Sequence, residues 1–302
     1  MTKIIHRLAR TLFVPALTVA ALLATTSVAA VSDVNRPNAA VLVGPCGLPG
    51  AMGPTSVDDD FTNRSVKAGI ADVSPNGVTT AADTVVFRNT IQNLGAGDDA
   101  FIISAPKAPA GFKIEISTDD GHSYVTVEQT STGVTEMVAY RAAATFLVRV
   151  TAPAGLKVLT GFDTVIRVAS TVNPSATNET IDRLYTGFVR IEKTSRIVSA
   201  TGPADKNAAP GAEIEFAITY TNISSAGGVG SSMLTARDLV IGENGFAAPN
   251  NWGATTEHVV GASDTRGGII LGDAAGSTSI TDMVLMLEAG QAGVFKFRRR
   301  IK

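Results

Sequence analysis

Few side chains in this sequence can carry acid–base or nucleophilic chemistry. Beyond the first thirty residues the only histidines are His122 and His258, and the only cysteine of the chain is Cys46. No G-x-S-x-G, H-E-x-x-H or cysteine-cluster motif brings such groups to catalytic or metal-binding spacing. The sequence therefore predicts a protein that is not an enzyme and holds no cofactor. Cys46 is read as a free thiol, with an intermolecular disulfide as the alternative.

Acidic residues gather at three places, and carboxylates gathered in loops can ligate calcium through oxygen. The three places are Asp58, Asp59 and Asp60, then Asp98 with Asp99, then Asp119 with Asp120. None has the D-x-[DN]-x-[DN]-G spacing of a calcium loop, which favours solvated turns over metal sites. The third place stands directly before Gly121 and predicts the tip of a hairpin.

The last stretch of the sequence carries the most pronounced charge pattern. Phe295, Phe297 and Ile301 fall on one face of an alternating strand, and Arg299 interrupts that face. The opposite face is basic and consists of Lys296, Arg298, Arg300 and Lys302. The favoured interpretation is a sheet edge that positive charge keeps from aggregating. The alternative is a head-to-tail contact with the acidic run 58–60 of another copy, which would build an open filament.

The N-terminus has the layout of a secretory signal. Three basic residues precede an apolar run from Leu12 to Ala24, and small residues follow. The run is shorter than the roughly 18–20 residues that span a bilayer, and Pro15 interrupts it, so a retained anchor is the less favoured alternative. We expect residues 1–30 to be a cleaved signal peptide, and the mature chain to be secreted or held at the cell surface without a transmembrane segment.

Composition narrows the class of partner. The formal net charge of −2 and the pI near 5.9 give no general attraction to nucleic acid or anionic membrane. Charged residues make up 17% of the chain, below the usual quarter, while small residues abound. This composition is typical of an extracellular β-protein with many turns. The expected partners are other copies of the chain or proteins of the cell envelope.

Two stretches repeat one pattern, an alternating apolar strand that ends in asparagine and continues into glycine-rich sequence. They are "ADTVVFRNTIQNLGAGDD" and "PGAEIEFAITYTNISSAGG". Three pairs match at a spacing of 129 positions: Phe87 with Phe216, Ile91 with Tyr220, and Asn93 with Asn222. The side chain of each asparagine is expected to bond the backbone two residues on and so open a turn. The equal spacing predicts an internal duplication.

The rest of the sequence continues the period of two, and no helical period of useful length appears. Turns such as "SPNG" and "TDDG" separate short strands. The expected strands are 66–70, 84–92, 100–104, 112–117, 123–127, 144–151, 163–171, 181–191, 195–200, 212–222, 235–241, 257–260, 269–271, 279–287 and 293–301. This pattern predicts an all-β fold of two tandem immunoglobulin-like β-sandwich domains.

The expected domain limits follow from the same pattern. A Gly/Pro-rich N-terminal segment covers residues 31–63, the first sandwich covers 64–194, and the second covers 195–302. The N-terminal segment is a candidate for an arm donated to the sheet edge of a neighbouring copy.

Both halves are similar to known repeats of bacterial surface proteins. The stretch "TGPADKNAAPGAEIEFAITYTNISSAGG" and the closing "LEAGQAGVFKFRRRIK" resemble the conserved-repeat domain called domain of unknown function eleven. The first half, with "FRNTIQNLGAGDDAF" and "APAGF", is similar to a related immunoglobulin-like repeat. The resemblance covers about residues 83–302 and implies an extracellular building block of the bacterial surface. It carries no catalytic residues.

The expected function is that of an exported, non-enzymatic structural or adhesive protein of the cell surface that is able to self-assemble. The alternative is a secreted module that binds a glycan or a protein through sandwich loops such as Gly242–Asn251. Sugar binding favours exposed aromatic platforms. Trp252 is the only tryptophan and tyrosines are few, which lowers that alternative.

Overall fold

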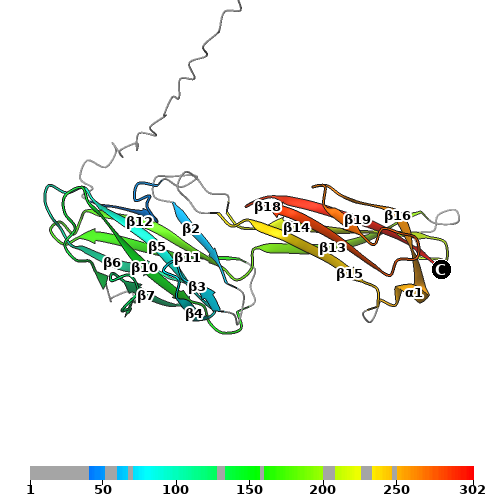
Figure 1. Ribbon diagram of the computed structural model, residues 1–302, viewed down its shortest axis with the longest axis horizontal. Coiled ribbons are helices and arrows are strands. Elements are labelled where there is room, and N and C mark those ends of the chain that lie inside the picture. Colours follow the sequence, from blue (N-terminus) through cyan, green and yellow to red (C-terminus); the bar gives the residue numbers. More distant parts are fainter. Residues whose placement is uncertain are drawn as a thin grey trace, which may run out of the picture.

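The computed structural model confirms an all-β chain of two β-sandwiches, which follow one another along the long axis of the molecule (Figure 1). The structure describes residues 41–51, 60–66, 71–127, 133–156, 160–199, 208–225, 233–246 and 250–302. The expected signal peptide, together with Asp58 and Asp59, therefore lies outside the described residues. Within the described ranges no helix is long and apolar enough to cross a membrane.

The first sandwich packs two five-stranded sheets against each other. One sheet has the order β1 (Val41–Pro45), β5 (Thr84–Asn93), β10 (Ala143–Thr151), β7 (Lys113–Ser117) and β8 (Val125–Thr126). The other has the order β2 (Phe61–Ser65), β12 (Thr177–Tyr185), β11 (Gly161–Ser170), β6 (Phe101–Lys107) and β9 (Gly133–Val134). A hairpin of β3 (Ala71–Val73) and β4 (Thr79–Ala82) contacts β5.

The core of the first sandwich forms from side chains that alternate along these strands. Val85, Phe87 and Ile91 of β5 are fully buried, and they meet Ile166 and Val168 of β11 in one apolar cluster. Each such side chain contributes about 1.5–3 kcal/mol when it leaves water. Period-two alternation therefore gives β5 one apolar face toward the core and a second face that points away from it.

The second sandwich packs a four-stranded sheet against a three-stranded one. The first has the order β13 (Val189–Ser199), β14 (Glu213–Asn222), β19 (Ala292–Ile301) and β16 (Thr256–Asp264). The second has the order β15 (Ala236–Asn244), β18 (Ser279–Leu287) and β17 (Ile269–Leu271), and the single turn α1 (Trp252–Thr255) precedes β16. Trp252, Phe295 and Phe297 lie in its core, with ring centroids of the last two 5.6 Å apart.

The asparagine at the end of each repeated strand has the expected role. Asn93 Oδ1 accepts the backbone N–H of Gly95 at 2.8 Å, and Asn222 Oδ1 accepts that of Ser224 at 3.0 Å. The Nδ2 group of each asparagine also donates to two backbone carbonyls, and both residues are fully buried. The two asparagines therefore fasten equivalent strand ends, β5 in the first sandwich and β14 in the second.

Asn89, which breaks the apolar face of β5 in the sequence, has a buried partner. Its Nδ2 group donates to both carboxylate oxygens of Asp182 on β12, at 3.1 and 3.0 Å. Asp182 is fully buried, and burial raises its pKa well above the usual range for an aspartate; the nearby Asp60 acts in the same direction. A polar contact between the two sheets thus replaces an apolar one at this position.

The strands around the junction differ from those expected. The predicted strand 181–191 is the end of β12 and the beginning of β13, separated by a three-residue connection that contains Gly187 with φ 155°. Apolar residues lie on both sides of this connection, so the sequence pattern conceals it. Since β13 runs to Ser199, the expected limit at 194/195 falls inside a strand. The division of the chain into two domains at the expected limits therefore stays a prediction.

Two further expectations about sheet edges are wrong. β1 lies in the expected N-terminal arm, yet it pairs with β5 of its own chain, and β2 pairs with β12, so these strands complete their own sandwich. β19 was expected at an edge, yet it pairs with β14 on one side and β16 on the other. Alternation reveals a strand but not its neighbours, because pairing is a long-range property.

Candidate functional site

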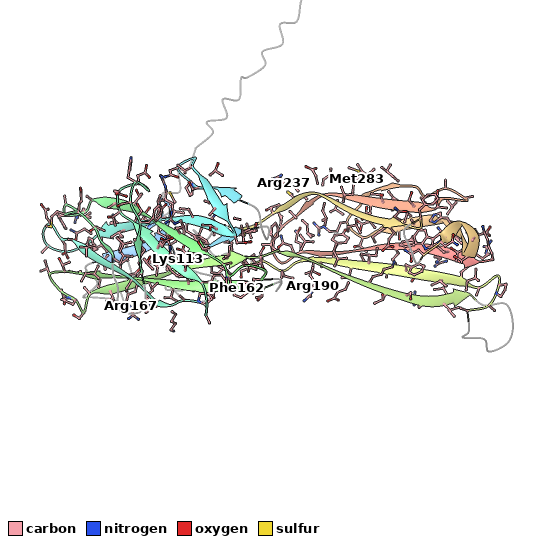
Figure 2. The ribbon with its side chains drawn as sticks, turned by 90° about the horizontal axis from the view of Figure 1, so that it is seen from below. Lys113, Phe162, Arg167, Arg190, Arg237 and Met283 are labelled. Carbon is pink, nitrogen blue, oxygen red and sulfur yellow. The ribbon has the colours of Figure 1, made fainter. Side chains whose placement is uncertain are left out.

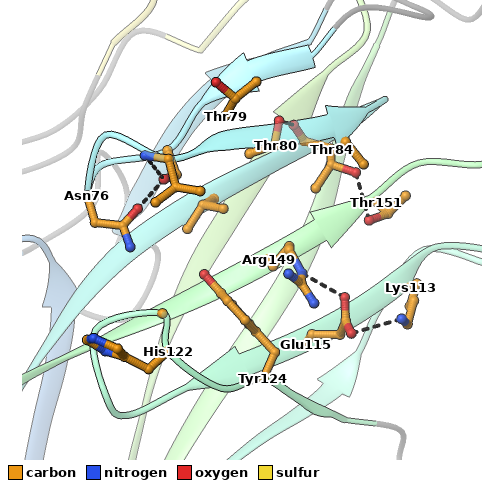
Figure 3. Close-up of a pocket in the computed structure, with 15 residues that line it drawn as sticks. Asn76, Thr79, Thr80, Thr84, Lys113, Glu115, His122, Tyr124, Arg149 and Thr151 are labelled. Atoms are coloured by element: carbon orange, nitrogen blue, oxygen red, sulfur yellow. Dashed lines mark hydrogen bonds and ion pairs between the residues drawn. The ribbon is translucent and has the colours of Figure 1, made fainter.

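A polar pocket of about 540 Å³ lies on the outer face of the first sandwich (Figure 3). Its floor is formed by two rows of side chains that run across β5, β10 and β7, on the side opposite the core. The rows are Thr84, Thr151 and Lys113, and then Val86, Arg149 and Glu115. The β3–β4 hairpin forms one wall, and the turn between β7 and β8 forms another.

The floor of the pocket contains a fixed cluster of two cations and one anion. Glu115 Oε2 is 2.8 Å from Arg149 Nε, and Glu115 Oε1 is 2.8 Å from Lys113 Nζ. Burial alone would raise the pKa of Glu115, but the hydrogen bonds from Arg149 and Lys113 outweigh it and hold the pKa below its usual range. Glu115 is therefore a carboxylate at neutral pH, and the cluster carries one net positive charge.

The wall beside this cluster is built by the turn predicted at Asp119 and Asp120. The Asp119 carboxylate accepts hydrogen bonds from the hydroxyls of Ser117 and Ser123, which lower its pKa, and from the Ser123 amide at 2.9 Å. The turn places Tyr124 so that the Arg149 guanidinium lies 3.8 Å from its ring centroid. The pocket thus combines the stacked guanidinium of Arg149, the ammonium group of Lys113 and several hydroxyl groups (Figure 3).

This arrangement is suited to binding and poorly suited to proton transfer. His122 lines the same pocket, but its Nδ1 lies 2.5 Å from the Asp119 carbonyl and its ring is exposed. Glu115 is held in its charged form by two cations, so it is not poised to take up a proton near neutral pH. Hydroxyls of Thr84 and Thr151, 3.0 Å apart, add groups that donate and accept hydrogen bonds.

His258 lies in a separate buried place in the second sandwich. Its Nε2 is 2.7 Å from Asp273 Oδ1, and its side chain is fully buried. The same carboxylate accepts the backbone N–H groups of Gly261 and Ala262. The pair is therefore part of the packing around β16. No cluster of three or more metal-ligating side chains occurs in the part of the chain that the structure describes.

The basic face of β19 is largely neutralised within its own sheet. Arg298 lies 3.2 Å from Glu215, and Arg300 lies 2.8 Å from Glu213 on β14 and 3.2 Å from Glu257 on β16. Lys302 donates to the carbonyl of Gly253 at 2.5 Å. Lys296 is exposed on the same face. The structure therefore supplies local acidic partners for the two arginines of the stripe that the sequence suggested for intermolecular docking.

Asp60 cannot take part in the predicted intermolecular contact as folded. It is 1% exposed, and its Oδ2 accepts the Thr180 hydroxyl at 2.5 Å inside the first sandwich. Cys46 is exposed and free, directly after β1, so the intermolecular disulfide stays a prediction. Of the two candidates, Asp60 is therefore a core residue, whereas Cys46 is accessible.

The loop Gly242–Asn251 does not present the tryptophan that follows it. Trp252 is 5% exposed, and Gly245 packs directly on its ring, where an added Cβ would come within 2.5 Å. Arg299, the residue that interrupts the apolar face of β19, is 1% exposed and places its guanidinium 4.1 Å from the Trp252 ring. Phe246 is exposed in this loop, and residues 247–249 lie outside the described ranges.

The pocket residues Lys113, Glu115, Tyr124 and Arg149 were missed by the sequence reasoning. A local signal exists for three of them, because Lys113, Glu115 and Arg149 alternate with apolar side chains in two strands, β7 and β10, whose expected bounds differ by one residue from those observed. The missing information is the register, which places Arg149 opposite Glu115 across 34 positions of sequence.

Comparisons with known proteins give no family. No family model matches the chain, and no curated protein sequence matches it, so the resemblance to the conserved-repeat domain stays a prediction. Several solved structures do match the chain, at low sequence identity. The N-terminal domain of PorA is 12% identical, with a TM-score of 0.29 over 49% of this chain and 98% of its own.

Two further matches are to streptococcal proteins. The C-terminal domain of the Streptococcus agalactiae AgI/II polypeptide BspA is 9% identical, with a TM-score of 0.33 over 84% of this chain and 90% of its own. The C-terminal domain of the Streptococcus pyogenes antigen I/II-family protein AspA is 10% identical, with a TM-score of 0.30 over 87% and 92%. These TM-scores and identities are too low to indicate a shared function.

Proposed function

We propose that the chain is an exported, non-enzymatic adhesive protein of the cell surface, and that the polar pocket of the first sandwich is its ligand-binding site. The observation that carries this proposal is the fixed cluster of Glu115, Arg149 and Lys113 on an outer sheet face. A cluster held by ion pairs and by stacking on Tyr124 loses little side-chain entropy when a ligand binds.

The chemistry of the pocket favours an acidic saccharide. The Lys113 side chain is 57% exposed and the Arg149 side chain 33% exposed, so both cations are accessible to an anionic group. Threonine and serine hydroxyls around them match the hydroxyl groups of a sugar. This proposal replaces the loop Gly242–Asn251 with a sheet face as the binding surface, and it retains the glycan as the class of ligand.

The test is titration of the protein with a uronic-acid oligosaccharide and with its neutral counterpart, followed by calorimetry. We expect the acidic sugar to bind more tightly than the neutral one, and Arg149→Gln to weaken its affinity at least tenfold, which is the loss typical of a charged hydrogen-bond partner. Arg167→Gln is the matched control, because Arg167 forms an equivalent cross-strand pair with Glu179 on β12 of the other sheet.

Two results would overturn the proposal. One is that neither sugar binds to the unaltered protein. The other is that Arg149→Gln and Arg167→Gln have the same effect, which would place the ligand elsewhere on the molecule.

A further inference from the structure

The edge strands of the two sandwiches differ in how they are protected from pairing with other chains. Among the described residues, the edge strands β1, β2, β8, β9 and β17 have five residues or fewer. β15 is interrupted by Asp238 at φ 51°. β16 has a register shift between Val259 and Ser263, and Asp273 covers two of its backbone N–H groups there. Short strands, bulges and capped amides are devices that keep an edge from pairing.

β13 has none of these three devices along most of its length. It runs for eleven residues, and among the described strands its one neighbour in the sheet is β14. Its register with β14 is regular from Val189 to Ile197, and all side chains from 191 to 196 are exposed. One long side of the second sandwich therefore presents a straight row of backbone groups; Arg190, labelled in Figure 2, lies at the end of β13 near the first sandwich.

The side chains of β13 are complementary to themselves when the strand is reversed. If a second β13 pairs antiparallel about a two-fold axis through Thr194, position i faces position 388 minus i of the partner. Ile191 then faces Ile197, and Glu192 faces Arg196, each of them twice because of the symmetry. Opposite charges and apolar pairs directly across an antiparallel ladder are stabilising.

The charges that would meet are accessible. The Glu192 side chain is 62% exposed and the Arg196 side chain is 69% exposed. Ile191 is 51% exposed, which is unusual for an isoleucine inside a strand. Arg196 also lies 2.8 Å from Glu215 of its own chain, and Glu215 has Arg298 as a second partner. A new contact at Arg196 therefore need not leave Glu215 without a cation.

We propose that the protein forms a two-fold dimer in which β13 of one copy pairs antiparallel with β13 of a second copy, with Thr194 on the axis. The two four-stranded sheets become one eight-stranded sheet. The contact is isologous and closes on itself, so it yields a dimer, in contrast to the head-to-tail filament that the sequence suggested. It uses a different sandwich from the saccharide pocket and does not depend on ligand binding.

The first test exchanges charges across the proposed axis and measures the dissociation constant by sedimentation. Glu192→Arg alone places arginine opposite Arg196 at both symmetric positions, and Arg196→Glu alone places glutamate opposite Glu192. We expect each variant to weaken dimerisation at least about tenfold. A mixture of the two variants restores opposite charges at every position, so we expect the mixed dimer to form with an affinity near that of the unaltered protein.

The control for this test is Glu136→Arg, which makes the same change of charge at an exposed position of the first sandwich. It is expected to leave the dissociation constant unchanged. Measurement at two salt concentrations further separates the charge contribution, since exposed pairs are screened within about 10 Å at 0.1 M salt.

The second test locates the axis by cross-linking in a Cys46→Ser background. Thr194→Cys brings two thiols opposite each other, with Cβ atoms about 4.5–5.5 Å apart, and a disulfide dimer is expected under mild oxidation. Arg190→Cys is the matched control, because Arg190 faces position 198 of the partner and its own copies lie far apart. A mass for the unaltered protein that stays monomeric at all concentrations overturns the proposal. A dimer whose dissociation constant is unchanged in Glu192→Arg also overturns it. So does a disulfide that forms in Arg190→Cys and not in Thr194→Cys, or a dimer that is lost in Cys46→Ser.

Discussion

Each sandwich has a fully buried aspartate with a raised pKa on the core side of one sheet, Asp182 in the first and Asp282 in the second. Asp282 on β18 is fully buried and faces Asp264, whose Oδ2 accepts the Tyr220 hydroxyl at 2.6 Å. Burial raises the pKa of Asp282 to about 6, and the neighbouring Asp264 acts in the same direction. Gly268 packs directly on the Asp282 carboxyl, where an added Cβ would lie 2.0 Å from Oδ1.

The raised pKa of Asp282 predicts a stability that falls as the pH rises. In the unfolded chain an aspartate titrates near about 3.9, so the stabilisation of the acid form is complete below that pH and is lost as the pH rises through about 6. We expect Asp282→Asn to raise the free energy of unfolding at pH 8 by about 1–2 kcal/mol and to flatten its pH dependence between pH 5 and 7. Urea denaturation across that range measures both effects.

The comparison variant for Asp282 is Asp163→Asn, which removes an exposed carboxylate paired with Arg183. It is expected to leave the slope between pH 5 and 7 as in the unaltered protein. If Asp282→Asn instead shows the same slope as the unaltered protein, the carboxyl at position 282 does not titrate between pH 5 and 7 and the account of this pair is wrong.

At the scale of the element, the repeated strand end explains why asparagine recurs 129 positions apart. Asn222 satisfies the carbonyl groups of Leu234 and Leu287 and the amide of Ser224. In Asn222→Ala these buried backbone groups lose their partners, and we expect the free energy of unfolding to fall by about 2–4 kcal/mol. Asn244→Ala is the control, because Asn244 ends β15 at the surface, and within the described part of the chain its side-chain oxygen accepts one hydrogen bond, from the amide of Phe246. Equal losses in the two variants would contradict the role assigned to Asn222.

Strands were predictable from the sequence where apolar and polar side chains alternate along the chain. β18 matches its expected bounds, and β5 and β14 differ from theirs by one residue at a single end. Strand partners were not predictable, because pairing joins residues that are far apart: Asn89 meets Asp182 across 93 positions. The same limit hid the pocket, whose two rows exist only once β5, β10 and β7 are in register. For the same reason the position of β19 was predicted wrongly. Its basic side chains indicated a sheet edge, but it lies between two strands that carry acidic residues.

At the scale of the whole molecule, the two sandwiches meet through a short connection and a small polar contact. β12 ends at Tyr185 and β13 begins at Val189, so three residues join them. Phe188 packs against the second core, and its carbonyl accepts the Ile223 amide at 2.8 Å. Tyr185 of the first sandwich reaches Ser225 of the second: its Oη accepts the Ser225 amide at 3.0 Å and lies 3.2 Å from the Ser225 hydroxyl. Arg183 also donates to that hydroxyl.

This contact predicts that the hydroxyl of Tyr185 restrains the connection between the sandwiches. Tyr185→Phe keeps the buried ring and removes the hydrogen bonds to Ser225, a loss of about 1 kcal/mol, which corresponds to about a fivefold larger population of the open connection. When opening is faster than cleavage, the rate of proteolysis follows that population. We therefore expect chymotrypsin to cleave after Phe188 about fivefold faster in Tyr185→Phe, as measured by the mass of the released sandwiches. Tyr140→Phe, at an exposed tyrosine of the first sandwich, is expected to leave the rate unchanged. An unchanged rate in Tyr185→Phe would mean that the hydrogen bonds to Ser225 do not restrain the junction, and that the packing of Phe188 against the second core sets its stiffness.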